Sequence, residues 1–268
     1  MLFRLSLIAA LLLALLTTAV AGVVVAASAA LPRSELAYVG FQTGTADIYV
    51  YDTLRARTHN LTASDAWDLS PSWSPDGSEM AFVSDRDGGL QVYVMDANGR
   101  NLRRVTPSGI AFEYPRWTAD GEQLSLIARG NPLPDTYIVN PDGSGFQLVA
   151  EGTFNQSGGF QQVGPALALV GGPASPVGTG FLSVEFTGTD RSLLLSPAEG
   201  EPGEVLAALG QIAGDATAAS WSPDGRLIAF LSAVDGQADL YLIEAWPGAQ
   251  QLRLTNDSAY ERSPVWRP

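Results

Sequence analysis

Short apolar runs of four to six residues, separated by turn-forming residues, follow one another along most of the chain. The runs are rich in Val, Ile, Leu, Tyr and Phe, and Gly, Pro, Asp and Asn stand between them. Examples are MAFVSD from Met80, VYVMD from Val92 and LRRVT from Leu102. Helices would need longer runs with a period of 3.6 residues, so the pattern predicts β-strands joined by tight turns. The sequence therefore predicts an all-β protein.

These strands repeat with a period of about 44 residues, and each repeat is marked by a Trp. The motif WSPDG occurs at Trp73–Gly77 and Trp221–Gly225, and a variant, WTADG, at Trp117–Gly121. A Thr stands eleven residues before Trp73, Trp117 and Trp266, and a Pro stands two before each of them. These residues are Thr62, Thr106 and Thr255, with Pro71, Pro115 and Pro264. Four short strands in a unit of this length are typical of a β-propeller blade.

The Asp-Gly pair of the motif predicts a tight hairpin between the first two strands of a blade. Asp can hydrogen-bond its own turn backbone, and Gly takes a positive φ at little cost. The Trp just before the turn packs well on a half-buried sheet. We therefore expect Trp73, Trp117 and Trp221 in the core between blades rather than stacked on a ligand.

The two ends of the repeat region complement each other. The chain ends on SPVWRP at Ser263–Pro268, which resembles a first strand, whereas the segment from Ser34 starts with a second strand. Pairing them would complete the N-terminal blade and remove exposed sheet edges. We expect one propeller domain over residues 34–268, closed by the C-terminal strand.

The stretch between Trp117 and Trp221 has lost the motif. Residues 160–209 keep apolar runs from Gly164, Phe181, Ser192 and Glu204 but have neither the Trp nor the Asp-Gly turn. We interpret this stretch as one degenerate blade. The sequence thus predicts a β-propeller of five four-stranded blades, or six if residues 152–170 contain another.

An uncharged segment, residues 5–31, precedes the propeller and follows Arg4. A signal peptide would use Leu5–Leu16 as its apolar region and be cut after Ala21 or Ala29. An uncleaved anchor would use the whole run, which is long enough to span a bilayer as a helix. Both alternatives predict one N-terminal hydrophobic helix over residues 1–31 and an exported propeller, periplasmic or at the cell surface. The membrane would be contacted only through this segment.

Composition removes several classes of function. The chain has no Cys and no Lys, and its net charge is −13. The missing Cys and Lys exclude a disulfide, a P-loop and a Schiff-base Lys. The negative charge disfavours the phosphate backbone of a nucleic acid, so we expect no nucleic-acid partner. His59 is the only histidine, so zinc sites built on several His or Cys are excluded, and no G-x-S-x-G motif is present.

Two acidic loops resemble calcium-binding loops, but each has too few oxygen donors to bind calcium. Asp85 and Asp87 alternate ahead of Gly88, and only Asp235 and Asp239 remain in the related loop. A calcium loop needs more ligands in register, so we interpret both loops as hairpin turns. We expect no catalytic residue, no metal and no cofactor.

The connections that enter each first strand are the better candidates for function. Such connections cluster at one end of a propeller, around the mouth of its central channel. They carry aromatic and acidic residues that are common at interfaces. The candidate partner-binding residues are Trp67, Asp68, Phe112, Glu113, Tyr114, Tyr260 and Glu261. The alternative is that the acids cap their own turns and the aromatics cover seams between blades.

The segment Ser70–Thr106, SPSWSPDGSEMAFVSDRDGGLQVYVMDANGRNLRRVT, resembles the WD40-like (PD40) repeat of TolB-type β-propellers. Ser220–Thr255 is a second good copy, and the likeness extends over nearly all of residues 34–268. The resemblance implies an exported β-propeller that binds other proteins.

Together these observations predict a monomeric, extracytoplasmic and non-catalytic propeller that binds an envelope or extracellular protein or peptide at its loop face. The alternative is a small propeller hydrolase or carbohydrate-binding protein with a divalent metal in the central channel.

Overall fold

The computed structural model describes residues 34–128, 135–150, 161–163, 166–168, 176–178, 180–187, 190–198, 201–211 and 219–268. Within these ranges every regular element is a β-strand, and paired strands run antiparallel. The prediction of an all-β protein is confirmed.

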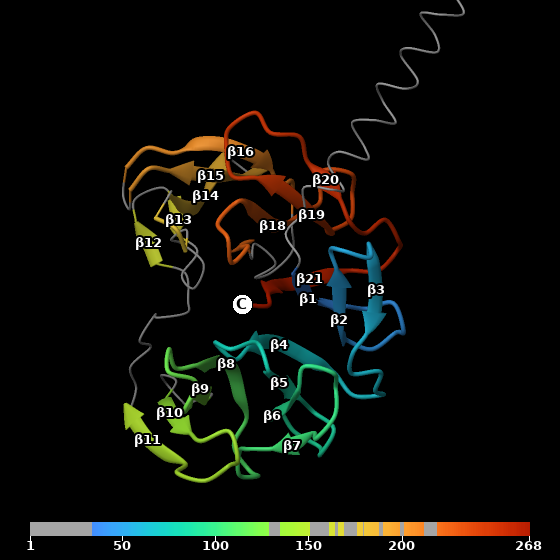
Figure 1. The fold of residues 1–268 in the computed structure, drawn as a ribbon, viewed down its shortest axis with the longest axis vertical. Coiled ribbons are helices and arrows are strands. Elements are labelled where there is room, and N and C mark those ends of the chain that lie inside the picture. Colours follow the sequence, from blue (N-terminus) through green and yellow to red (C-terminus); the bar gives the residue numbers. More distant parts are fainter. Residues whose placement is uncertain are drawn as a thin grey trace, which may run out of the picture.

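The described strands form five sheets, which Figure 1 shows distributed around the middle of the molecule. The first sheet has the order β21 (Glu261–Trp266), β1 (Glu35–Gly40), β2 (Asp47–Asp52), β3 (Arg57–Asn60). The second consists of β4 (Asp68–Trp73), β5 (Glu79–Ser84), β6 (Gln91–Asp96) and β7 (Arg103–Arg104). The third consists of β8 (Phe112–Trp117), β9 (Leu124–Ala128), β10 (Asp135–Val139) and β11 (Gln147–Ala150).

The fourth sheet has five strands and the fifth has four. The fourth consists of β12 (Gln161–Val163), β13 (Ala166–Ala168), β14 (Phe181–Thr187), β15 (Asp190–Ser196) and β16 (Glu204–Ala208). The fifth consists of β17 (Ala219–Trp221), β18 (Leu227–Ser232), β19 (Asp239–Glu244) and β20 (Leu252–Arg253). The four apolar runs expected in the degenerate stretch are strands of one sheet, β13 to β16, and β12 adds a fifth strand.

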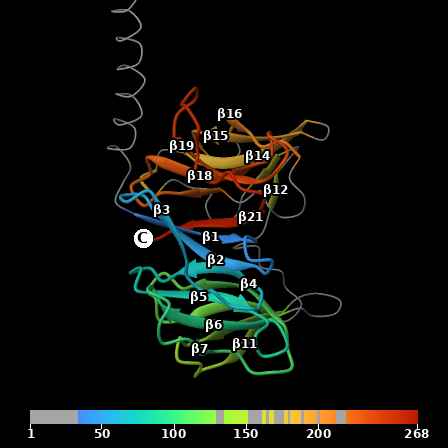
Figure 2. The same cartoon turned by 90° about the vertical axis from the view of Figure 1, so that its right-hand side faces the viewer.

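The strand nearest the C-terminus, β21, pairs with β1 near the start of the described chain. Leu36 lies opposite Trp266 and Gly40 lies opposite Glu261, and both views show the two strands side by side (Figures 1 and 2). This is the pairing that the repeat register predicts. It gives β1, which would otherwise be an edge strand, a partner on both sides.

The WSPDG turns have the conformation that their sequence predicts. At Trp73–Gly77 the Gly77 N–H donates to the Ser74 carbonyl at 2.8 Å, and Gly77 has a φ of +69°. Hydrogen bonds from the Ser74 hydroxyl, and then from the Ser78 N–H and hydroxyl, lower the pKa of Asp76 to about 2. The Asp therefore stays ionised and holds the hairpin between β4 and β5 together.

The repeat Trp residues lie between sheets, as expected. Trp73, Trp221 and Trp266 are buried, and Trp117 is half-buried. The Trp117 indole donates to the Ser72 carbonyl of the preceding sheet at 3.0 Å, and Trp266 donates to Ser220 at 3.1 Å. Buried apolar clusters join the fourth, fifth and first sheets, the first and second, and the second and third. The Trp117 and Trp266 indoles thus hydrogen-bond one sheet to the next, whereas Trp73 and Trp221 contribute through apolar packing.

The innermost strand of three sheets contains a β-bulge at the repeat Pro. The pairing register shifts at this point in β4, β8 and β21. The residue before each Pro has a positive φ: Ser70 (+52°), Tyr114 (+51°) and Ser263 (+51°). A positive φ is costly for a residue with a Cβ, and Pro disfavours helical conformations in the residue before it. The bulge is therefore a repeated feature that the surrounding sheet imposes.

One end of the sheets carries two kinds of connection. The β1–β2, β5–β6 and β18–β19 connections join paired strands, and the β3–β4, β7–β8 and β20–β21 connections lead from one sheet to the next. We call this end the mouth face. The WSPDG turns lie at the opposite end of the same sheets.

Three predictions concern residues outside the described part. The hydrophobic helix expected over residues 1–31 and its two candidate cleavage sites lie there, as do residues 152–160, 164–165 and 169–170 of the segment considered for a sixth blade. In the part of the chain that the structure describes, no helix is long and apolar enough to cross a membrane.

Candidate functional site

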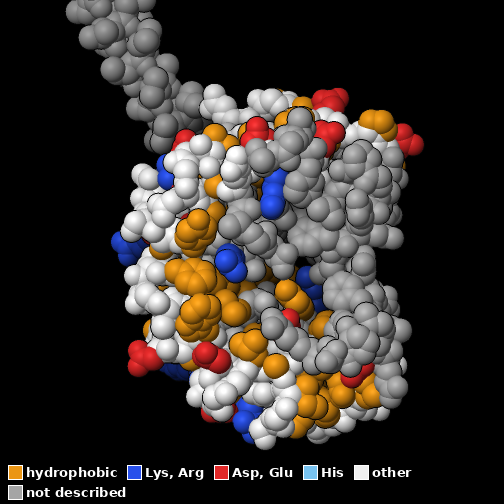
Figure 3. All heavy atoms as spheres, turned by 180° about the vertical axis from the view of Figure 1, so that it is seen from behind, with side chains coloured by type: hydrophobic (Ala, Val, Ile, Leu, Met, Phe, Trp, Pro, Cys, Tyr) orange, Lys and Arg blue, Asp and Glu red, His pale blue; other side chains and the backbone are white. Residues whose placement is uncertain are grey.

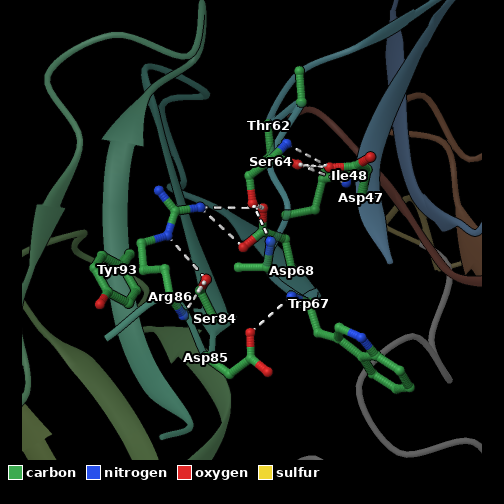
Figure 4. A network of polar contacts seen from close by, with 12 residues as sticks. Asp47, Ile48, Thr62, Ser64, Trp67, Asp68, Ser84, Asp85, Arg86 and Tyr93 are labelled. Atoms are coloured by element: carbon green, nitrogen blue, oxygen red, sulfur yellow. Dashed lines mark hydrogen bonds and ion pairs between the residues drawn. The ribbon is translucent and has the colours of Figure 1, made fainter. Parts of the chain in front are cut away.

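A buried ion pair lies beneath the mouth face where β4 begins (Figure 4). Asp68 is fully buried, and both of its carboxylate oxygens accept from one guanidinium nitrogen of Arg86, at 2.9 and 3.1 Å. The Arg86 Nε donates to the Ser84 hydroxyl at 2.9 Å, and its guanidinium lies 5.0 Å from the centre of the Tyr93 ring. Hydrogen bonds and an aromatic face thus fix Arg86 from two sides.

The connection from β3 to β4 is attached to this pair and to a second buried acid. The Ser64 hydroxyl donates to Asp68 at 3.1 Å, and the Ser64 N–H donates to Asp47 at 3.0 Å. Burial opposes ionisation of Asp47, but hydrogen bonds from Ser64, Thr43, Asn60 and Thr62 outweigh it and lower the pKa of this carboxyl. The connection is therefore held by a charged group on each side.

Trp67 projects from this fixed connection into solvent. Its side chain is 49% exposed, and its backbone N–H donates to the Asp85 carboxylate at 2.8 Å. Figure 4 shows its indole pointing away from the Asp68–Arg86 pair. The Trp67 ring meets Phe41 of the β1–β2 connection edge-on, with 6.1 Å between ring centroids. Trp67 is thus an exposed aromatic side chain whose backbone is already held in place.

The aromatic surface continues over the first sheet. Arg262 lies over the Phe41 ring at 5.8 Å, and the neighbouring Tyr260 is 43% exposed. Seen from behind, the molecule shows hydrophobic side chains gathered over the part where β1 to β3 lie (Figure 3). We call Phe41, Trp67, Tyr260 and Arg262 the aromatic patch.

The structure divides the predicted site residues into two groups. Trp67, Tyr114 and Tyr260 are exposed, at 49%, 43% and 43%, and Glu113 is half-buried. The other three, Asp68, Phe112 and Glu261, are fully buried. The buried three occupy equivalent positions at the start of β4, β8 and β21. The exposed group lies on the surface of the mouth face, whereas the three buried side chains lie beneath it.

Glu261 differs from the other buried acids because it has almost no partners. Gln42 donates to its Oε1 at 3.3 Å, and its Oε2 has no hydrogen-bond partner. Burial, and then the charge of Asp257, raise the pKa of Glu261 to about 8. The Thr255 hydroxyl lowers the pKa of Glu261 in part. The hydrogen bond that this hydroxyl donates goes to Asp239, at 3.4 Å. Glu261 is therefore mostly a neutral acid at pH 7.

Sequence reasoning identified the repeat Thr residues but not their role. The Thr62 hydroxyl accepts from the Ile48 N–H at 3.0 Å and donates to Asp47 at 3.2 Å. Equivalent pairs join Thr106 to Gln91 and Thr255 to Asp239. The Thr thus clamps the last strand of a sheet to the one before it. The signal was present as an Asp or Gln fifteen or sixteen residues before each Thr.

The acidic loops hold neighbouring side chains, which agrees with their interpretation as hairpin turns. Asp87 accepts from the Tyr93 hydroxyl at 2.7 Å and pairs with Arg104 at 3.2 Å. Asp235 accepts from the Tyr241 hydroxyl at 3.2 Å. Among the described residues, no three His, Cys, Asp or Glu side chains are grouped so that they could hold a metal ion. His59 lies exposed on β3.

Two open hollows lie between neighbouring connections of the mouth face. One of about 390 Å³ is lined by Ser64, Asp65, Ala66, Asp85 and Arg86. Another of about 770 Å³ lies between the fourth and fifth sheets, with Arg191, Gln211 and Val234 in its lining. The first adjoins Trp67, so a partner that covers the aromatic patch would also reach a hollow with polar walls.

Comparison with known proteins relates the chain to one family. A model of the TolB β-propeller domain (PD40) matches residues 16–170, which is more than half of the sequence. No curated protein sequence matches. The solved structure of TolB from Acinetobacter baumannii is 23% identical with a TM-score of 0.44, and the match covers 87% of this chain and 54% of that one. This chain thus spans about half the length of that TolB.

Solved structures of enzymes are similar as well. Oligogalacturonate lyase from Vibrio parahaemolyticus is 12% identical with a TM-score of 0.46, over 84% of this chain and 75% of that one. The isopeptidase AtxE2 is 9% identical with a TM-score of 0.50, over 80% of this chain and 47% of that one. Identities this low concern the fold alone.

Proposed function

Since this chain belongs to the TolB β-propeller domain family, we propose that it is an exported, non-catalytic and monomeric propeller that binds a protein or peptide at its mouth face. The observation that carries this proposal is Trp67, which is half exposed on a backbone held by Asp85. Tryptophan is enriched among the residues that dominate binding energy at protein interfaces. A side chain that is already positioned loses less entropy when it is covered.

The rest of the aromatic patch supports the same conclusion. Phe41 holds Trp67 from one side and carries Arg262 on its face. Aromatic residues and Arg are enriched at interfaces relative to the rest of a protein surface. Another exposed Trp, Trp246, lies in the β19–β20 connection at the opposite end of the sheets and bonds Glu244 within its own turn. It offers a matched control.

We further propose that the five sheets are the blades of one ring, closed by β21 in the first blade. The β21–β1 pairing and the indole hydrogen bonds between sheets support this ring. Removing residues 263–268 would take away most of an inner strand and its buried Trp266. The shortened protein should lose most of its stability in a thermal melt. A melt like that of the full chain would contradict the closed ring.

Export is part of the proposal, through residues 1–31 acting as a signal peptide or an anchor. Fractionation of cells that produce the full chain should place it outside the cytoplasm. The mass of the purified chain would distinguish the two alternatives, because cleavage removes about 21 to 29 residues at the small-residue sites.

To test partner binding, the purified protein is cross-linked to its partners in an envelope extract, and the cross-linked proteins or peptides are then recovered with it. Trp67→Ala and Tyr260→Ala should each reduce recovery of the same protein or peptide, because each removes an exposed aromatic side chain of the patch. Trp246→Ala should leave recovery unchanged. Equal recovery with all three variants would refute the mouth face as the binding surface. Asp68 and Glu261 do not belong to the exposed patch that these variants test, because both side chains are buried.

A further inference from the structure

The first residue of the inner strand lies at the mouth face and is a different residue type in each of three sheets. The first residues of β4, β8 and β21 are Asp68, Phe112 and Glu261, and their N–H groups donate to equivalent carbonyls, those of Ala46, Leu90 and Ala238, at 2.7, 3.0 and 3.3 Å. The pairings agree, since Asp68 lies opposite Ser84 and Glu261 lies opposite Gly40. The three positions are therefore structurally equivalent and can be compared directly.

In the second sheet a cation completes this position. Arg86, two residues beyond Ser84, pairs with Asp68 and lies 5.0 Å from the Tyr93 ring and 5.4 Å from the Phe82 ring. These two rings stack with 5.9 Å between centroids. The arrangement combines a buried carboxylate, a guanidinium and an aromatic pair, and each of its contacts favours the cation.

In the first sheet the acid and the aromatic pair remain, but the cation does not. Glu261 replaces Asp68, and Tyr38 and Tyr49 stack at 5.7 Å in the place of Phe82 and Tyr93. Gln42, two residues beyond Gly40, stands where Arg86 would be. A neutral amide with one hydrogen bond of 3.3 Å cannot neutralise a carboxylate, and the Glu261 Oε2 has no partner.

The neighbouring charged groups do not supply the missing cation. In the second and fifth sheets an Arg of the last strand lies opposite a Tyr: Arg104 opposite Tyr93, and Arg253 opposite Tyr241. In the first sheet the neutral Asn60 lies opposite Tyr49 at this position. Arg253 is paired with Asp239 and Asp235 of the fifth sheet. Arg262 lies over Phe41. The remaining charged neighbour of Glu261, Asp257, is an acid that shares Gln42 with it.

We propose that an arginine side chain of the bound protein or peptide enters the first sheet at the mouth face, pairs with Glu261, and rests on Tyr38 and Tyr49 as Arg86 rests on Phe82 and Tyr93. This inference depends on the proposed partner binding at the mouth face. The Gln42 side chain, which is exposed and held only by two hydrogen bonds of 3.3 Å, moves aside to admit it. The adjoining aromatic patch would cover the residues that flank the arginine.

Binding of a cation here must release a proton. Near pH 7 Glu261 is mostly protonated in the free protein, because burial and Asp257 raise its pKa to about 8. A guanidinium against the carboxylate favours the ionised form and lowers the pKa. The proton then leaves to the buffer, so the heat of binding depends on the ionisation enthalpy of the buffer. At pH 9 the acid is already ionised and the release disappears.

The test uses the full chain and two probe peptides in titration calorimetry, acetyl-Gly-Arg-Gly-amide and the same peptide with citrulline, which has the shape of arginine without its charge. With the natural protein at pH 7, the arginine peptide should bind at least tenfold more tightly than the citrulline peptide and release close to one proton. Gln42→Arg places a guanidinium in the site as in the second sheet, so it should abolish this preference. Glu261→Gln should abolish it as well, and circular dichroism checks that both variants are folded.

Equal binding of the two peptides, or binding without proton release at pH 7, would overturn the proposal. If Gln42→Arg does not fold, Glu261→Gln carries the test by itself, because it replaces a neutral acid with a neutral amide of the same shape. Capture of the envelope partner separates this inference from the proposed function. Loss of capture with Trp67→Ala but not with Gln42→Arg would retain the mouth face and reject the arginine site.

Discussion

Replacing Glu261 with Gln should stabilise the protein at neutral pH and leave its stability at pH 4 nearly unchanged. Glu261 is fully buried and its pKa is raised to about 8, whereas in the unfolded chain it titrates near its ordinary value of 4.5. The folded state therefore binds this proton more tightly than the unfolded state. Below pH 4.5 both states are protonated and the acid costs nothing. As the pH rises from 4.5 to 8, stability is lost.

The size of this effect follows from the two pKa values. One unit of difference corresponds to about 1.4 kcal/mol, so between pH 4.5 and pH 7 the loss reaches about 3 kcal/mol. Gln cannot ionise and keeps the volume of the acid, so the variant should be more stable than the natural protein by roughly that amount at pH 7. In a chain of this size about 3 kcal/mol corresponds to a rise in Tm of about 6–12 °C.

Urea unfolding at intervals between pH 4 and pH 9, followed by fluorescence, measures this difference. Every other acid titrates in both proteins, so subtracting the two curves isolates Glu261. The difference in the free energy of unfolding should be near zero at pH 4 and grow up to about pH 8. A constant difference over the whole range would refute the reasoning, because it would mean that Glu261 has a similar pKa in both states.

Three further sets of variants test the other parts of the structure by urea unfolding at pH 7. Arg86→Met should cost about 3–5 kcal/mol because it leaves the buried Asp68 carboxylate without its cation. Adding Asp68→Asn should recover at least about 1 kcal/mol of this loss. Equal losses in the single and double variants would exclude a coupled pair. Trp266→Phe should lower the free energy of unfolding by about 1 kcal/mol more than Trp221→Phe does. The Trp266 indole donates a hydrogen bond to the Ser220 carbonyl, whereas the buried Trp221 nitrogen has no partner. A larger loss with Trp221→Phe would contradict a role of this hydrogen bond in joining two sheets. Ser263→Gly should stabilise the protein by up to about 1 kcal/mol and Ser263→Val should destabilise it by about 1–2 kcal/mol, because the position has a φ of +51°. Unchanged stability in both variants would mean that the bulge relaxes freely.

The sequence determined the strands, the turns and the pairing of β21 with β1. These features depend on neighbours in the chain and on an internal repeat. Alternating short apolar runs fix which segments are strands, and Asp-Gly fixes the hairpin after each Trp. The Trp residues were correctly placed between sheets for the same reason, since a large apolar ring beside a turn has few other places to be buried.

Only the tertiary structure decided which candidate residues are accessible. Trp67 and Asp68 are adjacent in sequence, yet one is half exposed and the other fully buried beside Arg86, which is eighteen residues further along. Burial and charge pairing depend on what neighbouring strands bring to the same point, and a strand pattern does not specify this. The equivalence of Glu261 with Asp68, and the exchange of Arg86 for Gln42, became visible through the strand register alone. A repeat fixes the backbone of each copy, whereas the side chains that differ between copies meet only in the folded sheet.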